Sequence, residues 1–174
     1  MADDELVTVV SYDGAQFKTE VKVAKMSGTL AKLIVDSGVE QTIPLPTVSG
    51  KNLELALEFC KHYTLSPPNE NELDIEPEEE VERYKIEPEK RREIKNPWAK
   101  QFCEKLDTAT VIEMIAAANY LEIKQLLTVT CKSLATRLNG KTVEGMRQEL
   151  NIVSDFTPEE EERLRQENAW VEEA

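Results

Sequence analysis

The sequence has few of the residues from which catalytic and metal sites are built. It contains one histidine, His62, and three scattered cysteines, Cys60, Cys103 and Cys131. A structural zinc site needs a cluster of closely spaced ligands, and no two cysteines here are separated by only two residues. For His62 we weigh a catalytic dyad against a partly exposed histidine near a helix end, and favour the second. The sequence therefore predicts no metal site, no cofactor and no catalytic residue, and indicates a protein that is not an enzyme.

Glycine-rich loops and long apolar runs are also missing. The six glycines stand singly, so no loop is suited to cradle phosphates. No apolar run approaches the roughly 20 residues that span a membrane, and the first five residues are acidic rather than typical of a signal peptide. The three cysteines are scattered, with no closely spaced pair, which indicates buried, reduced thiols. We therefore expect no membrane association and a cytoplasmic and nuclear location.

Charge of one sign dominates the chain. The 174 residues include 34 acidic and 21 basic side chains, for a net charge of −13. Nucleic-acid phosphates would be repelled by this excess, so we expect no nucleic-acid partner. The length suits one domain, or a core domain with an appendage.

Hydrophobic patterning predicts strands before helices. Residues 6–10 are apolar and β-branched, Asp13-Gly14 is a turn signal, and residues 17–23 resume the alternation of a second strand. The prolines of residues 43–46 favour an extended segment. One helix is expected around residues 30–37, ended by Gly38. Another is expected to have Ser49 and Gly50 at its entry and Leu53, Ala56, Leu57 and Cys60 on one face.

Residues 66–95 interrupt this pattern. Four prolines break a run dominated by glutamate, with few large apolar residues to bury. Such composition is typical of a disordered or extended acidic loop, here an insertion within a domain.

Helical spacing returns after this loop. Two helices are expected to begin at Asn96 and at Asp107 or Thr108, and a third runs over 123–138 until Gly140 stops it. Strands followed by helices indicate an α+β fold with a helical extension.

The C-terminal segment contains two capping signals. Thr142 precedes a helix with Met146 and Leu150, although the capping-box partner expected at position 145 is a glycine. Farther on, Thr157, Pro158 and Glu160 have the spacing of an N-cap, a first helical residue and a capping-box partner. A short charged helix of this kind is not stable alone in water, so it needs a surface on which to pack.

Three segments closely resemble the S-phase-kinase-associated adaptor family, the small subunit of SCF (Skp–cullin–F-box) ubiquitin ligases. They are "IPLPTV" at 43–48, "AAANYLEIKQLLTVTCKSLA" at 116–135 and "NGKTVEGMRQELNIVSDFTPEEEERLRQENAW" at 139–170. With a similar N-terminal half, the resemblance covers nearly the whole chain. It implies a BTB/POZ core over residues 1–138, which includes the acidic loop, and F-box-binding helices over 139–174. It also implies an adaptor that joins a cullin to F-box proteins.

The resemblance implies a cullin-binding surface on the helices that carry Trp98, Phe102, Asn119 and Tyr120. From the sequence alone, Trp98 and Phe102 are more typical of a core, and Asn119 could instead cap its helix. The family usually has an acidic residue after the tryptophan, whereas Ala99-Lys100 stands here.

Large apolar residues of the C-terminal part exceed what two short helices need for packing. The resemblance implies that they form a mixed core with F-box helices; an alternative is a homodimer that uses the same surface when no F-box is bound. The matching proline in some protist members is hydroxylated and glycosylated, which makes Pro158 a candidate modification site. The predicted F-box-binding residues are Leu127, Leu134, Leu138, Leu150, Ile152, Phe156 and Trp170.

Overall fold

The computed structural model describes residues 5–74, 88–153 and 155–168. The chain divides into two compact units, Met1–Asn139 and Gly140–Ala174, which are described separately below. Within the described residues, no helix is both long enough and apolar enough to cross a membrane.

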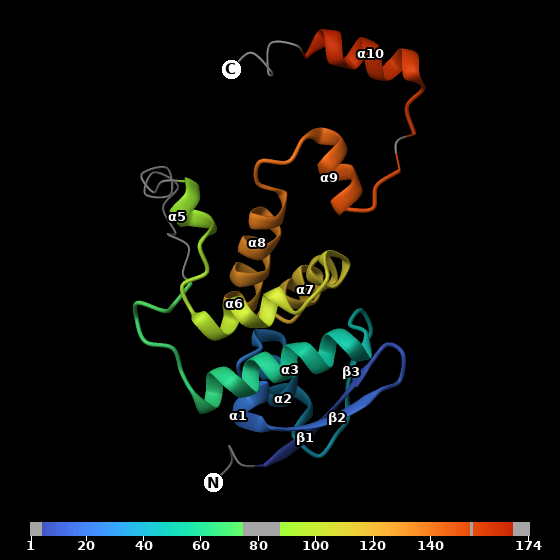
Figure 1. Ribbon diagram of the computed structural model, residues 1–174. Helices are drawn as coiled ribbons and strands as arrows, with labels where there is room; N and C mark the ends of the chain where they lie inside the picture. The colour runs from blue at the N-terminus through green and yellow to red at the C-terminus, as the bar shows by residue number, and fades with distance from the viewer. Residues whose placement is uncertain (1–4, 75–87, 154, 169–174) are drawn as a thin grey trace. The chain divides into compact units, whose positions relative to one another are not determined.

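A small mixed sheet opens the first unit (Figure 1). β1 (Leu6–Ser11) lies in the middle, antiparallel to β2 (Gln16–Glu20) and parallel to β3 (Ile43–Leu45). Alternate residues of β1 are buried, as its period-two pattern predicts. Gly14 has a φ of 85° in the turn that joins β1 to β2, where the Asp13-Gly14 signal stands.

The second strand is shorter than the sequence pattern predicts. It ends at Glu20, and α1 (Val21–Ala24) follows directly. Val23 and Ala24 are adjacent and both buried, which a strand with alternating faces does not allow but a helical turn does. The expected strand over 17–23 is therefore wrong in its last three residues.

Helices cover the sheet and complete the core. α2 (Gly28–Ser37) ends at Gly38, and α3 (Gly50–Leu65) begins after the Ser49 cap, both as predicted. α3 contacts β1 and β2 on one side and α7 on the other. The described residues of this unit also form α5 (Pro88–Arg92), α6 (Pro97–Glu104), α7 (Thr108–Tyr120) and α8 (Lys124–Leu138).

The predicted caps of α6 and α7 are present. The Asn96 side chain accepts a hydrogen bond from the Ala99 amide, and the Asp107 side chain accepts one from the Thr110 amide. Each cap satisfies a backbone donor that has no partner within its own helix, which fixes where the helix begins.

The 66–95 segment is attached to α8 at two points, which the expectation of a loop with little to bury does not include, although most described residues of 66–73 are exposed. Asp74 is 1% exposed and forms an ion pair with Lys132 of α8, at 2.8 Å. The Lys95 amide donates to the same carboxylate, and Lys132 also donates to the Glu93 carbonyl. α8 therefore holds the two ends of the segment. The apolar residues of 75–87 lie outside the described residues.

The second unit contains α9 (Val143–Glu149) and α10 (Pro158–Glu167). Thr142 caps α9, and Thr157 and Glu160 form the predicted capping box of α10 with Pro158 at its start. No residue of 140–168 whose side chain the structure describes is buried, so this unit has no core of its own among those residues.

Candidate functional site

α8 has a buried face and, on a different side, an apolar stripe. Leu126, Val129, Thr130 and Ser133 face the core of the first unit. Leu127, Leu134 and Leu138 are half-buried, and their spacing places them along a different side of the helix. We call these three leucines, together with Cys131, the α8 stripe.

Cys131 belongs to this stripe because it is exposed, which corrects the expectation that all three thiols are buried. Cys60 and Cys103 are buried as expected. Burial raises the pKa of Cys60 to about 12 and that of Cys103 to about 11, so both thiols stay protonated at neutral pH. Cys131 follows Leu127 by four residues and precedes Leu134 by three. This helical spacing is the signal in the sequence that places Cys131 on the same side of α8 as the leucines.

Arg137 fixes the end of α8. Its guanidinium donates to the Cys103 and Leu106 carbonyls, at 2.8 and 2.7 Å, and to the Thr108 hydroxyl at 3.0 Å. These acceptors lie where α6 ends and α7 begins, so one side chain joins three helices. The α8 stripe is therefore presented on a rigid support.

The second unit exposes large apolar side chains. Ile152 is 54% exposed and Phe156 is 48% exposed, while Leu150 is half-buried. Val143, Met146 and Val153 are also exposed and were not among the predicted F-box-binding residues, although Val143, Met146 and Leu150 have helical spacing. We call these six residues the tail set. Trp170, predicted with them, lies outside the described residues.

The α10 capping box depends on an ionised glutamate. The Glu160 carboxylate accepts hydrogen bonds from the Thr157 amide and hydroxyl, at 2.9 and 3.0 Å. These bonds hold the pKa of Glu160 below its ordinary value of 4.5. Since the folded form has the lower pKa, the stabilisation is present above 4.5 and is lost as pH falls through the folded value. Pro158 is exposed beside the box, so its ring is accessible to a modifying enzyme.

We therefore expect the first turn of α10 to fray on acidification. Backbone chemical shifts of residues 157–161, recorded between about pH 6 and pH 3, should lose helical character as Glu160 is protonated. Glu160→Gln keeps an acceptor without the titration and should weaken this pH dependence. An equal pH response in both proteins would show that other carboxylates control the helix.

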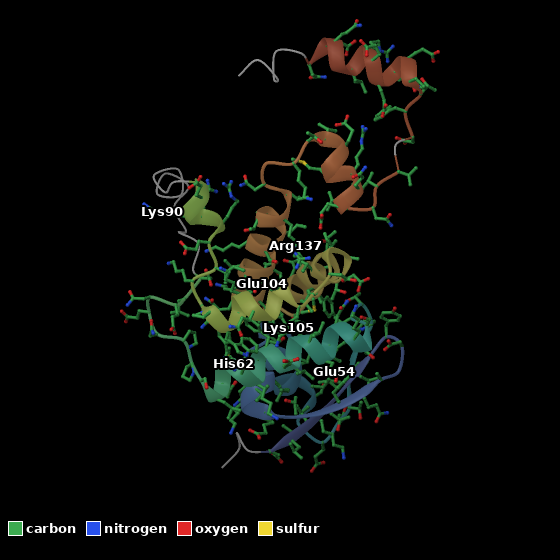
Figure 2. The ribbon with its side chains drawn as sticks, in the orientation of Figure 1. Glu54, His62, Lys90, Glu104, Lys105 and Arg137 are labelled. Carbon is green, nitrogen blue, oxygen red and sulfur yellow. The ribbon has the colours of Figure 1, made fainter. Side chains whose placement is uncertain are left out.

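Trp98 lies in an aromatic cluster between α3 and α6. Its ring stacks on His62 at a centroid distance of 3.7 Å and on Phe102 at 5.3 Å, with Phe59 and Tyr63 close by (Figure 2 labels His62 on α3). Trp98 is half-buried, whereas Phe102 is 5% exposed. Phe102 is thus part of the core and presents almost no surface to a partner. The sequence alone also favoured a core position for it.

Asn119 and Tyr120 lie at the end of α7, away from the contacts made by Trp98. The helix continues through both residues to a C-cap at Leu121, so Asn119 does not cap it. Asn119 is exposed and Tyr120 is half-buried. The four residues predicted for the cullin-binding surface therefore form two groups. Trp98 and Phe102 stack on each other, whereas Asn119 and Tyr120 lie at the end of α7.

The start of α2 holds the α7–α8 junction. Ser27 and Thr29 donate their hydroxyls to the Leu121 and Tyr120 carbonyls, at 2.5 and 2.6 Å. Glu122 follows with a φ of 54°, a strained value for a residue with a side chain. A Cβ at Gly28 would meet the Glu122 carboxylate at 2.5 Å, so glycine lets the two segments approach closely. The junction that presents Asn119 and Tyr120 is therefore rigid.

No group of histidine, cysteine and carboxylate side chains in the described residues could hold a metal ion.

Ala99 is fully buried and Lys100 is exposed, so the residue after Trp98 is a core position in this chain.

Comparison with known proteins identifies the family. Residues 5–65 match the Skp1 family tetramerisation domain, and residues 124–171 match the Skp1 family dimerisation domain. The chain is 42% identical over 170 residues to the SCF ubiquitin ligase complex protein SKP1a of Dictyostelium discoideum, with 96% of each chain covered. It is 39% identical to SKP1-like protein 1A of Arabidopsis thaliana, over 95% of this chain and 96% of that protein. With this similarity over almost its whole length, and with the POZ-type sheet and helices described above, the chain belongs to the Skp1 family.

Proposed function

We propose that this chain bridges a cullin and F-box proteins within an SCF ubiquitin ligase complex. Relatives that match it over nearly their whole length are named as SCF complex proteins or SCF subunits. The chain is accordingly an adaptor and not a catalytic subunit of such a complex.

One observation supports the F-box side most strongly. The tail set is apolar, yet no described residue of 140–168 is buried. Exposed apolar residues in such number are typical of a surface that a partner covers. An F-box contributes helices, and helices with apolar faces are the natural complement of the α8 stripe and of the tail set. An F-box would thus cover two exposed side chains, Ile152 and Phe156, and complete the burial of four half-buried ones, Leu127, Leu134, Leu138 and Leu150.

The cullin side is proposed for the α7–α8 junction. Asn119 is exposed and Tyr120 half-buried, on a backbone that the α2 hydroxyls hold in place. A tyrosine with an apolar ring and a polar tip is suited to the centre of an interface. Trp98 belongs to a separate aromatic cluster, and we assign it to the edge of this surface.

The mechanism follows from holding two partners at once. A substrate held by the F-box protein and an enzyme held by the cullin are brought to high effective concentration. The adaptor needs rigidity rather than reactive groups for this task. The links from α2 to the α7–α8 junction and from Arg137 to α6 and α7 supply that rigidity.

Replacing Asn119 and Tyr120 with lysine should break cullin binding and spare the F-box. Two ammonium groups in a desolvated interface are costly unless they find acidic partners, and we expect roughly a hundredfold loss of cullin affinity in calorimetry. Tyr12→Lys with Gln16→Lys adds the same two positive charges at exposed positions near the β1–β2 turn and serves as a control for charge alone. Equal loss of both affinities with a lower melting temperature would mean that the two residues support the fold instead.

The tail set also favours a second candidate function, a self-associating scaffold. A twofold pair of chains would bury the same apolar side chains without an F-box. Sedimentation over a concentration series, with and without an F-box domain, separates the two functions. Dimers that dissociate when an F-box domain is added support the adaptor. Dimers that persist when an F-box domain is present support the scaffold.

A further inference from the structure

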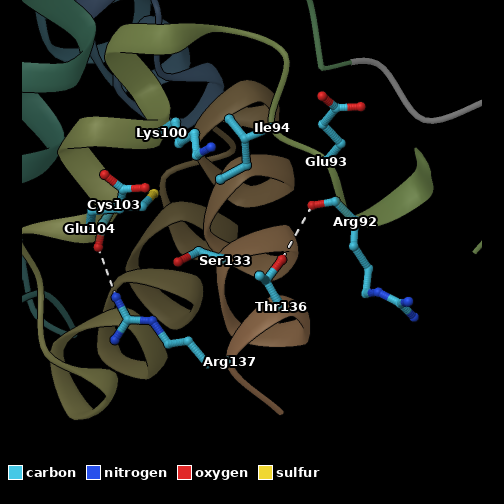
Figure 3. A pocket seen from close by; sticks show the side chains of 9 residues that line it. All are labelled: Arg92, Glu93, Ile94, Lys100, Cys103, Glu104, Ser133, Thr136 and Arg137. Carbon is cyan, nitrogen blue, oxygen red and sulfur yellow. Dashed lines mark hydrogen bonds between the residues drawn. The ribbon is translucent and has the colours of Figure 1, made fainter. Parts of the chain in front are cut away.

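A pocket lies beside α8 on a different side from the stripe. It has a volume of about 210 Å³ and is lined by residues from the 92–94 segment, α6 and α8 (Figure 3). Cys103 and Ser133 are buried at its floor, and Ile94 adds apolar surface. We call it the α5–α8 pocket. Neither the cullin surface nor the F-box surface proposed above includes any residue that lines it.

Basic side chains surround this pocket in a strongly acidic chain. Residues 88–105 contain six lysines and arginines and three glutamates, a net charge of +3, whereas the whole chain has a net charge of −13. Arg92, Lys100 and Arg137 line the pocket itself, with Glu93 and Glu104 as the opposing carboxylates. Figure 2 shows Lys90 on α5, at the start of this basic segment. The lining of the pocket therefore has three basic and two acidic side chains, a positive excess in a chain whose overall charge is negative.

The walls of the pocket are fixed. Arg137 is held by the Cys103 and Leu106 carbonyls, so its charge stays at one edge. The Thr136 hydroxyl donates to the Arg92 carbonyl at 3.4 Å, and this bond and one made by Arg137 are drawn as dashed lines in Figure 3. The Lys132–Asp74 pair anchors the 92–94 segment through the Glu93 carbonyl. Burial raises the pKa of Cys103 to about 11, so the thiol at the floor adds no negative charge. A ligand thus meets a preformed cavity.

We propose that the α5–α8 pocket docks an acidic peptide segment of a protein partner, which inserts one large apolar side chain and pairs its flanking carboxylates with the basic rim. The volume is below the roughly 300–1,000 Å³ of clefts that enclose whole small molecules, and it suits a single side chain. A long polyanion such as nucleic acid would meet the net charge of −13 on the rest of the chain. A short acidic segment reaches the basic rim and avoids most of that repulsion, so charge complementarity selects it.

The test uses the full-length chain and three fluorescein-labelled peptides. The first has one tryptophan flanked by glutamates, the second has alanine in place of the tryptophan, and the third has lysine in place of the glutamates. Anisotropy should show binding of the first alone, weakening as salt rises from about 0.05 to 0.5 M. Arg92→Glu with Lys100→Glu should weaken that binding roughly tenfold or more. Lys18→Glu with Lys61→Glu makes the same charge change at exposed positions elsewhere and should leave it nearly unchanged.

A neutral variant separates the pocket from the charge around it. Thr136→Trp places a large ring at the mouth of the pocket, on an exposed position, and should also weaken binding roughly tenfold at an unchanged melting temperature. If Thr136→Trp and the alanine peptide bind as the wild type does, the pocket takes no anchor and the proposal fails. It also fails if the control pair weakens binding as much as the pocket pair. If the chain forms dimers and Arg92→Glu abolishes them, the pocket binds a second copy of the chain, and the proposal is overturned.

Discussion

Replacing Ile152 and Phe156 with alanine is expected to reduce F-box affinity by roughly a thousandfold while cullin affinity is unchanged. Large apolar anchors at the centre of an interface typically cost 2 kcal/mol or more each when truncated, and two such losses correspond to about three decades in Kd. Both side chains are about half exposed in the described chain, so the fold of the first unit does not depend on them. Their energetic role is therefore confined to the complex.

Calorimetry with an F-box domain and with a cullin N-terminal domain measures the two affinities separately. Val35→Ala with Leu65→Ala is the matched control, because these residues are 82% and 67% exposed on α2 and α3, outside both proposed surfaces. The control should change neither affinity by more than about threefold. An F-box affinity that survives the Ile152 and Phe156 changes would refute the assignment of the tail set.

Deleting residues 155–174 extends this test to Trp170, which the sequence predicts as a further anchor. The deletion removes the capping box and α10 together with Phe156. We expect F-box binding to fall below detection and cullin binding to survive. Loss of both affinities would show that the second unit supports the first.

Local signals in the sequence predicted where helices begin and end. Ser49, Asn96, Asp107, Thr142 and Thr157 each cap a helix through a side-chain oxygen. These motifs could be read because a cap satisfies amide groups two or three residues away, within a single short stretch of sequence. The same locality explains why the shift from strand to helix at Val21 was missed, since its cause is burial of Val21, Val23 and Ala24 against the rest of the unit.

Burial of particular side chains could not be read in this way. Asp74 stands in a run of acidic residues, and only its pairing with Lys132, 58 positions later, places it inside. Phe102 and Trp98 have the same helical spacing, yet one is in the core and the other is half-buried. Such differences depend on contacts between elements that are distant in sequence. The candidate site was therefore predicted best where helical spacing sufficed, as for the leucines of the α8 stripe.

Lys132→Met is expected to destabilise the first unit by about 3–5 kcal/mol. Removing one partner of a buried ion pair leaves the other charge in a desolvated position, which costs far more than the pair itself contributes. The Asp74 carboxylate would keep its hydrogen bond from the Lys95 amide, at 3.2 Å, but would lose its ion pair with the Lys132 ammonium, at 2.8 Å. Its other oxygen is buried with no hydrogen-bond partner in the described residues, so nothing there compensates the charge. Since whole domains are stable by about 5–15 kcal/mol, the change should be obvious in urea unfolding.

Two further variants show whether burial is the cause. Lys132→Met with Asp74→Leu removes both charges and should recover most of the lost stability, because replacing a buried pair by apolar residues is often close to neutral. Lys32→Met breaks the Lys32–Glu122 pair, whose side chains are 67% and 50% exposed, and should cost less than about 1 kcal/mol. If Lys132→Met costs no more than Lys32→Met, the pair does not hold the 66–95 segment to α8. In that case residues 88–95 should exchange their amides as fast as an unstructured chain, and the α5–α8 pocket would lose one of its walls.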